Sequence, residues 1–354
     1  MWMYVVIFIV LLVTELAYFR IAKRFGIVDK PSVRSSHSSA VLRGGGVIIP
    51  LSMLLWAVLL GLMNAGSLAI DFWPFLIGLL LVAVTGFVDD VRPLPATLRL
   101  VILFLVAGML LGQLMTENGG LYVDHWFNWL AVFVIALILF VGIVNIVNFM
   151  DGINGITSVY SLVVLLSLLI LNKRADVPFI PSSYLWVGAL GVLVFGLFNF
   201  RPKGNAKCFG GDVGSLSIGF IMVFAVSRLI RQTGDVTWLM LLMVYGVDGG
   251  LTIVHRLMLH ENLSIAHRKH AYQLMANELG MDHRVVAVLY AAMQAGVSLV
   301  AIYVIPDTQM ARWIYLVSVG LALSVAYVVF MKKYYHLHEA YLERQQERQQ
   351  EGKE

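Results

Sequence analysis

A chain of 354 residues that is 60% hydrophobic and only 13% charged is too apolar to be a soluble globular protein. Its apolar residues form continuous runs of roughly 17–20 residues, as in membrane-spanning helices, and not the ~10-residue alternating segments of a membrane β-barrel. The sequence, with a formal net charge of +4, therefore predicts an all-α, polytopic integral membrane protein.

Eleven apolar runs are candidate spans, with ten as the alternative count. Arg20, Lys23 and Arg24 follow the first run and no basic residue precedes it, which is typical of a retained anchor with its N-terminus outside. Alternating the spans from there places twenty of the 25 Lys and Arg residues inside, so the unusual polar loops face the cytoplasm. The runs fall at about 2–19, 47–63, 72–88, 98–115, 129–148, 156–171, 184–199, 213–230, 237–257, 285–305 and 311–331.

The first inside loop, residues 29–46, combines cations and hydroxyls with three glycines ahead of a span. Its Arg34, His37 and Arg43 would suit an anionic ligand. The three glycines could add backbone N–H groups at a helix start. Contact with lipid headgroups is the alternative interpretation of this loop.

The third span ends on two adjacent carboxylates, Asp89 and Asp90. Adjacent helical residues point about 100° apart, so the two acids are expected to have different roles. Either could bind a hard cation or accept a proton. Helix-end ion pairs with Arg92 or Arg99 are the alternative.

The stretch from Asn145 to Gly155, NIVNFMDGING, directly follows an uncharged run. On a helix Asn145, Asn148 and Asp151 would fall along one side. A carboxylate at the centre of a bilayer costs about 2.5–3.5 kcal/mol, so Asp151 needs a partner, a cavity or a metal ion. A polar helix end followed by a glycine turn is the structural alternative.

A further inside loop leads through FGGDVGSLSIG into the eighth span. Asp212 lies near the expected start of that helix, where the glycines would let a ligand approach the backbone. A capping aspartate is the alternative role. However, four independent caps are an improbable explanation for four carboxylates at one membrane face, namely Asp89, Asp90, Asp151 and Asp212.

The last inside loop, residues 260–273, contains His267 and His270 with Arg268 and Lys269 between them. Two histidines at this spacing can bind zinc, but the loop has neither HExxH nor a cysteine partner. The flanking cations favour a phosphate ligand with a histidine as donor.

The predicted cytoplasmic loops thus combine acidic residues that could bind a divalent cation with basic residues that could bind phosphates. Asp248 and Arg256 are expected to be partners of these residues or to line their pocket. This combination suits a reaction in which Mg²⁺ bridges a diphosphate while a second phosphate attacks it. Neither a Walker A nor a GxGxxG motif is present, so an ATP-driven pump finds no support.

In this order, RSSH with GGG, GFVDD, NIVNFMDGING, FGGDVGSLSIG and HRKH resemble the signatures of the polyprenyl-phosphate N-acetylhexosamine-1-phosphate transferase superfamily. The resemblance extends over about two thirds of the chain. It implies transfer of a sugar 1-phosphate from a UDP-N-acetylhexosamine to undecaprenyl phosphate, with release of UMP and a requirement for Mg²⁺, with Mn²⁺ as an alternative. It also implies a bacterial inner membrane location.

The resemblance assigns roles residue by residue. The paired acids of the third span match the family's acids, one of which would act as a base on the lipid phosphate. The predicted catalytic residues are Asp89, Asp90, His267 and His270; the metal ligands are Asp151 and Asp212; the substrate-binding residues are Arg34, His37, Arg43, Asn148, Gly152, Asn154, Asn199, Arg268 and Lys269.

This sequence departs from the family pattern in two places, and the first bears on the branch. The family loop often reads HIHH, whereas Arg268 and Lys269 stand here in the middle, and the segment from Asn199 to Asp212 is longer than usual. A muramyl-pentapeptide donor would be expected with a PIHHH-like loop, which favours the lipopolysaccharide or capsule branch over a phospho-N-acetylmuramoyl-pentapeptide transferase. A secondary transporter for an anionic metabolite is the alternative from another class.

The chain is expected to form one transmembrane catalytic domain, residues 1–335. A polar tail, residues 336–354, is expected to be a solvated helix or a disordered end on the cytoplasmic side. The expected partners are the UDP-N-acetylhexosamine, undecaprenyl phosphate and membrane lipid. A homodimer is compatible with this interpretation, and no nucleic-acid partner is expected.

Overall fold

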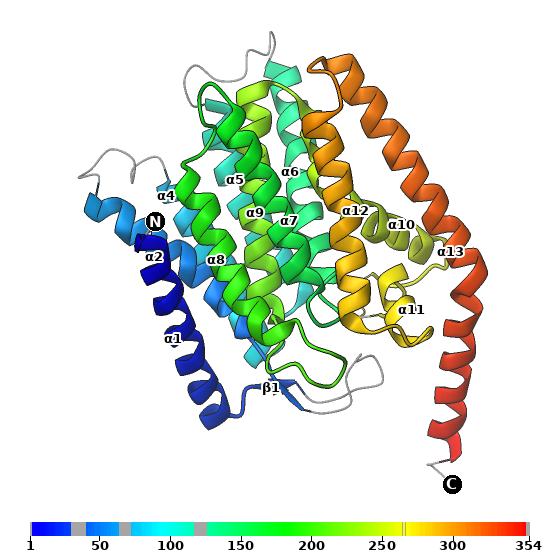
Figure 1. The fold of residues 1–354 in the computed structure, drawn as a ribbon. Coiled ribbons are helices and arrows are strands. Elements are labelled where there is room, and N and C mark those ends of the chain that lie inside the picture. The colour runs from blue at the N-terminus through cyan, green and yellow to red at the C-terminus, as the bar shows by residue number, and fades with distance from the viewer. Residues whose placement is uncertain are drawn as a thin grey trace.

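The computed structural model describes residues 2–29, 40–63, 72–116, 126–263, 265 and 267–351. Eleven helical segments in these ranges are long and apolar enough to cross a membrane. The all-α, polytopic membrane fold predicted from the sequence is therefore confirmed. Figure 1 shows one bundle with α1 at one flank and α13 at the other.

Most of the spans are single α-helices, but two include a 3₁₀ segment. The second span starts with η1 (Gly45–Val47), and the ninth starts with η3 (Val236–Leu242). The helices are α1 (Trp2–Phe25), α2 (Ile48–Met63), α4 (Trp73–Val91), α5 (Ala96–Thr116), α6 (Trp126–Phe149), α7 (Ile156–Arg174), α8 (Ser182–Asn199), α9 (Gly211–Thr233), α10 (Met243–Met258), α11 (Ala271–Asn277), α12 (His283–Tyr303) and α13 (Gln309–Glu351).

Helix α9 forms the centre of the bundle. Every residue from Val213 to Val226 is buried, as expected for a helix that is apolar on all sides. Glycines on α4 allow this helix to pack closely against it, because a Cβ at Gly78 would lie 2.8 Å from the Phe220 ring and one at Gly86 would lie 2.7 Å from the Asp212 backbone. The close packing places the end of α4 beside the start of α9.

A short hairpin closes the same end of the bundle. Strands β1 (Val28–Asp29) and β2 (Val41–Leu42) pair antiparallel, and Leu42 also bridges to Cys208 in the loop before α9. The Gly46 N–H then donates to the Gly210 carbonyl at 3.0 Å. These backbone bonds attach the loop after α1 to the segment that enters α9.

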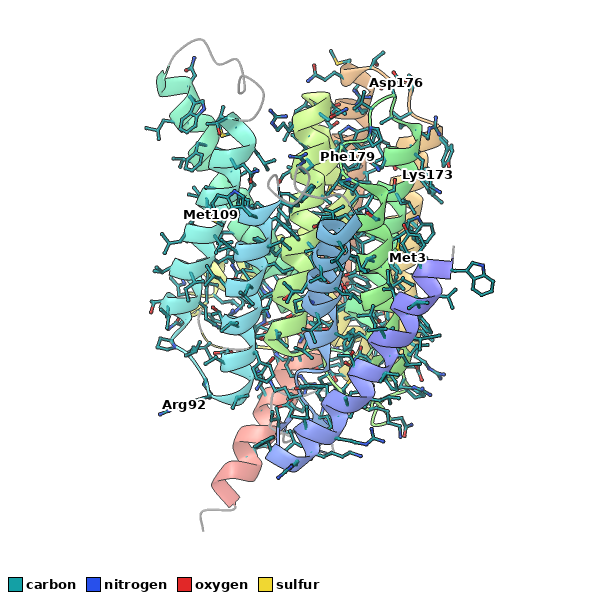
Figure 2. The ribbon with its side chains drawn as sticks, turned by 90° about the vertical axis from the view of Figure 1, so that its left-hand side faces the viewer. Met3, Arg92, Met109, Lys173, Asp176 and Phe179 are labelled. Atoms are coloured by element: carbon teal, nitrogen blue, oxygen red, sulfur yellow. The ribbon has the colours of Figure 1, made fainter. Side chains whose placement is uncertain are left out.

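The two ends of the bundle differ in chemistry. Figure 2 shows Arg92 at one end and Lys173, Asp176 and Phe179 at the opposite end. Helices α4 and α6 finish at the Arg92 end and α9 starts there, so their terminal polar residues meet. The distribution of basic residues predicts that this end faces the cytoplasm.

Cysteine labelling would test this orientation. In a Cys208→Ala background, a Lys203→Cys variant should react with an impermeant maleimide only from the cytoplasmic side, since Lys203 is exposed in the loop before α9. The matched variant Val177→Cys, at a residue 63% exposed beyond α7, should react only from outside. The opposite labelling pattern would show that the predicted topology is inverted.

Candidate active site

Asp90 binds the N-terminus of α9 from a different helix. Its Oδ1 accepts from the Asp212 N–H at 2.9 Å and its Oδ2 from the Val213 N–H at 3.1 Å, while Arg43 Nε donates to Oδ1 at 2.8 Å. The carboxylate side chain has no exposed surface. A negative charge is stabilising at a helix N-terminus, so Asp90 serves as the cap that α9 lacks on its own residues.

Capping by Asp90 requires a glycine at position 211. Gly211 has φ of +69°, and a Cβ there would overlap the Asp90 carboxylate. The Asp212 side chain is therefore not needed to cap its own helix. Its carboxylate is available for other contacts.

Arg99 lies between two of the predicted functional acids. Its Nη1 donates to Asp89 Oδ2 at 3.0 Å and forms a second, very short bond to Asp212 Oδ2. Asp89 Oδ1 accepts from the Leu94 N–H at 2.7 Å. The two adjacent acids of α4 thus have different partners, as the geometry of a helix predicts. From the sequence alone, Arg99 is expected only as the partner of a helix-end ion pair.

Asn148 completes this cluster from α6. Its Nδ2 donates to Asp212 Oδ1 at 3.1 Å and to Ser215 Oγ at 2.8 Å. A pocket between α4, α5, α6 and α9 is lined by Asn145, Asn148 and Arg99. The predicted residues Asp89, Asp90, Arg43, Asn148 and Asp212 are therefore brought together.

Asp151 lies beside the same entry to α9. A Cβ at Gly210 would lie 2.6 Å from Asp151 Oδ2. Desolvation, reinforced by repulsion from the Asp212 carboxylate, raises the pKa of Asp151 to about 6. The two predicted metal ligands thus interact electrostatically.

The side chains that could ligate a metal ion at this site indicate which ion it could bind. Among the described residues, no group of three or more His, Cys, Asp or Glu could hold an ion. Mg²⁺ commonly binds through one or two carboxylates together with water and substrate phosphates. Asp151 and Asp212 fit such a site, whereas a closed zinc site would need more protein ligands.

Two of the predicted substrate-binding amides bind backbone in this structure. Asn199 accepts from the Gly155 N–H at 2.7 Å and donates to the Cys208 carbonyl at 2.9 Å. Asn154 donates to the carbonyls of residues 201–202 at 3.2 and 3.0 Å. Both side chains are almost fully buried, so they shape the glycine turn and the loop behind it.

The histidine loop rests on the same turn. A Cβ at Gly152 would overlap the Tyr272 hydroxyl and lie 2.7 Å from Gln273 Nε2. The Tyr272 hydroxyl donates to the Phe149 carbonyl at 2.9 Å. The glycine at position 152 therefore allows α11 to approach the end of α6.

Asp248 orients His270. One of its oxygens lies 3.2 Å from His270 Nδ1 and also accepts from the Ala271 N–H, and the other accepts from the Tyr290 hydroxyl at 2.5 Å. His270 Nε2 has no partner among the described residues. A carboxylate on one ring nitrogen fixes the tautomer and leaves the other nitrogen for a ligand. This supports the expectation that Asp248 is a partner within the site.

His267 is a neutral neighbour of this pair. Its ring centroid lies 5.0 Å from that of His270, and its Nδ1 accepts from the Lys269 N–H at 3.3 Å. Desolvation, with the nearby positive charges, lowers the pKa of His267 to about 3. Without an anion beside it, the imidazole of His267 is therefore uncharged near neutral pH.

The two cations of the loop are paired with acids. Arg268 Nη2 donates to Glu278 Oε1 at 2.8 Å, and Lys269 forms a very short ion pair with Glu261. Their predicted roles in substrate binding stay predictions. Arg34 and His37 lie outside the described residues.

Asp90→Asn should destabilise the protein. The buried carboxylate accepts two backbone N–H bonds and an arginine, and hydrogen bonds to a charged group contribute about 1.5–3 kcal/mol. We expect a clearly lower midpoint of thermal unfolding in detergent. The control Asp176→Asn, at an exposed residue of the opposite end, should leave the midpoint unchanged. Equal midpoints for the two variants would contradict the capping role.

Two comparisons with known proteins bear on the family of this chain. Residues 72–230 match the family model of glycosyl transferase family 4. The chain is 28% identical over 306 residues to the probable undecaprenyl-phosphate N-acetylglucosaminyl 1-phosphate transferase of Bacillus subtilis (strain 168), and the match covers 81% of each chain. Both findings support the superfamily predicted from the motifs, the polyprenyl-phosphate N-acetylhexosamine-1-phosphate transferases.

Proposed function

We propose that this protein transfers a sugar 1-phosphate from a UDP-N-acetylhexosamine, GlcNAc or a related sugar, to undecaprenyl phosphate in a bacterial inner membrane. UMP is released, and the product is the first lipid-linked intermediate of a cell-surface polysaccharide such as O-antigen or capsule. The observation that carries the proposal is the meeting of Asp89, Asp151 and Asp212 with Arg43 and Arg99 at one end of the bundle. The name of the Bacillus relative points to the same reaction.

Mg²⁺, or Mn²⁺ in its place, is the proposed cofactor. Asp151 and Asp212 would hold it, since Asp212 lies in the first turn of α9, Asp151 lies beside Gly210 at the entry to that helix, and Asp90 is already occupied by the helix N-terminus. When bound, the ion would neutralise these carboxylates and stabilise charge on the transferred phosphoryl group. Asn148 holds Asp212 in place from α6.

Of the two acids of α4, Asp89 is the better candidate for the base that contacts the lipid phosphate. Both oxygens of Asp90 accept backbone N–H bonds from α9, and Arg43 binds one of them. Asp89 is also buried, but it accepts one backbone N–H bond and shares with Asp212 the side chain of Arg99, which is 32% exposed. Arg99 could therefore exchange one acid for an incoming phosphate.

The reaction is proposed to be a direct in-line displacement. An oxygen of undecaprenyl phosphate attacks the donor's β-phosphorus, the bond from that phosphorus to the bridging oxygen breaks, and UMP leaves with that oxygen. With a proton on each ring nitrogen, His270 would donate one hydrogen bond to Asp248 from Nδ1 and one to the donor's phosphate side from Nε2. A covalent enzyme intermediate trapped with labelled donor alone would favour double displacement.

The location of the polar residues favours an enzyme over a transporter. Transporters place their binding residues near the bilayer midplane, at broken helices. Here Asp89 and Asp90 lie in the last turn of α4, and Asp212 lies in the first turn of α9.

UMP release would test the proposal directly. Purified protein should release UMP from one donor in a panel of UDP-N-acetylhexosamines and UDP-muramyl-pentapeptide, only when both undecaprenyl phosphate and Mg²⁺ are present. Chelation by EDTA should stop the release, and added Mg²⁺ should restore it. Release from the muramyl donor would assign the peptidoglycan branch, and release without the lipid would contradict the proposed acceptor.

Asp212→Asn should lower the turnover number by on the order of 10²-fold or more, because the variant loses the charge that would hold the metal and balance Arg99. The same activity assay would measure it, after size-exclusion chromatography has shown that the variant is folded. Asp176→Asn, which changes an exposed acid at the far end, should retain full turnover. Unchanged turnover in Asp212→Asn would exclude Asp212 from the reaction.

A further inference from the structure

Helix α13 extends well beyond the membrane. Its 43 residues from Gln309 to Glu351 would measure about 65 Å at 1.5 Å per residue, while the hydrocarbon core of a bilayer is about 30 Å thick. Figure 1 shows the helix running along the flank of the bundle past α11. The part beyond the span is therefore placed beside the histidine loop.

A buried three-residue network joins this extension to the loop. Glu278 Oε1 accepts from Arg268 Nη2 at 2.8 Å and lies 3.1 Å from His338 Nδ1. The three side chains are 4%, 10% and 1% exposed, respectively. Buried polar groups with mutual partners favour one arrangement, since removing one partner leaves the others unsatisfied.

Aromatic rings of α13 cover both cations of the loop. The Arg268 guanidinium lies 4.2 Å from the centroid of Tyr341, and Lys269 Nζ lies 5.9 Å from that of Tyr335. Such cation–π contacts are worth most where the cation is shielded from water. Both cations inside the HRKH motif are therefore turned toward α13.

A second connection reaches His270 from the membrane part of α13. The Tyr327 hydroxyl lies 2.8 Å from Thr252 Oγ1, which donates to Asp248 Oδ1 at 3.2 Å. The same Asp248 oxygen binds His270. Tyr327 and Met331 also pack in one apolar cluster with Ala271 and Leu274 of α11.

We propose that the extension of α13 is a positioning element for the histidine loop, with His338 and Tyr341 as its positioning residues. Arg268 locks the loop to α13 through Glu278 and does not bind the donor. The imidazoles of His267 and His270 are thereby fixed at the site. The expected effect on kcat rests on the proposed transferase function. The effect of α13 on the order of the histidine loop can be measured without substrate.

The kinetic test compares a double variant, His338→Ala with Tyr341→Ala, with the wild-type full-length protein. Misplacing a catalytic group by about 1 Å can cost on the order of 10²-fold, so kcat for UMP release should fall by about 10- to 100-fold. The KM for undecaprenyl phosphate should not change, because the proposed contacts of its phosphate, Asp89 and Arg99, bond to each other and to Asp212 at the start of α9, not to α13, in the described part of the chain. His338→Asn with Tyr341→Phe keeps an amide donor and the ring, and should restore kcat.

The substrate-free test uses backbone hydrogen exchange of the same proteins. Exchange of the amides in residues 267–273 should rise in the double alanine variant and stay at the wild-type level in Glu343→Gln with Glu347→Gln, two exposed residues of the same helix. Unchanged exchange in the double alanine variant would overturn the proposal, even for a protein that releases no UMP. Changed exchange with unchanged kcat would overturn the positioning role while leaving the transferase function intact.

Discussion

The structure depends on the contact between the Asp90 carboxylate and the first backbone N–H groups of α9. A buried charge is tolerated only with partners, and here a helix N-terminus and Arg43 supply them. The same contact fixes α4, α9 and the loop after α1 relative to one another. The contact places Asp212, whose own N–H takes part, and Asp89, which is adjacent to Asp90 in sequence.

The spans could be predicted from the sequence because a bilayer imposes a length and a composition on each of them. The meeting of Asp89, Asp90, Asp151 and Asp212 was also accessible, since the topology puts the ends of their helices at one face. The sequence does not predict which of these acids caps α9. Asp212 occupies the position at which a local cap would be sought, yet the cap comes from a residue 122 positions earlier.

Two further features depended on packing between distant parts of the chain. Arg99 lies in the first turn of α5 outside any motif, and only the approach of α4 and α9 places it between two acids. The sequence predicts a solvated helix or a disordered end for the tail because its composition is polar and repetitive. The contact of α13 with the histidine loop could have been predicted from the spacing of Tyr335, His338 and Tyr341, which lie three residues apart and share one helix face.

The sequence separations around Asp90 have a consequence for biosynthesis. Arg43 lies 47 residues before Asp90, so this ion pair can form as soon as α4 has entered the membrane. The bonds to α9 span 122 and 123 residues and must wait until the eighth span emerges. During that interval Arg43 can neutralise the Asp90 carboxylate without α9. The ion pair that can form first thus remains in the finished site, beside the helix that Asp90 later caps.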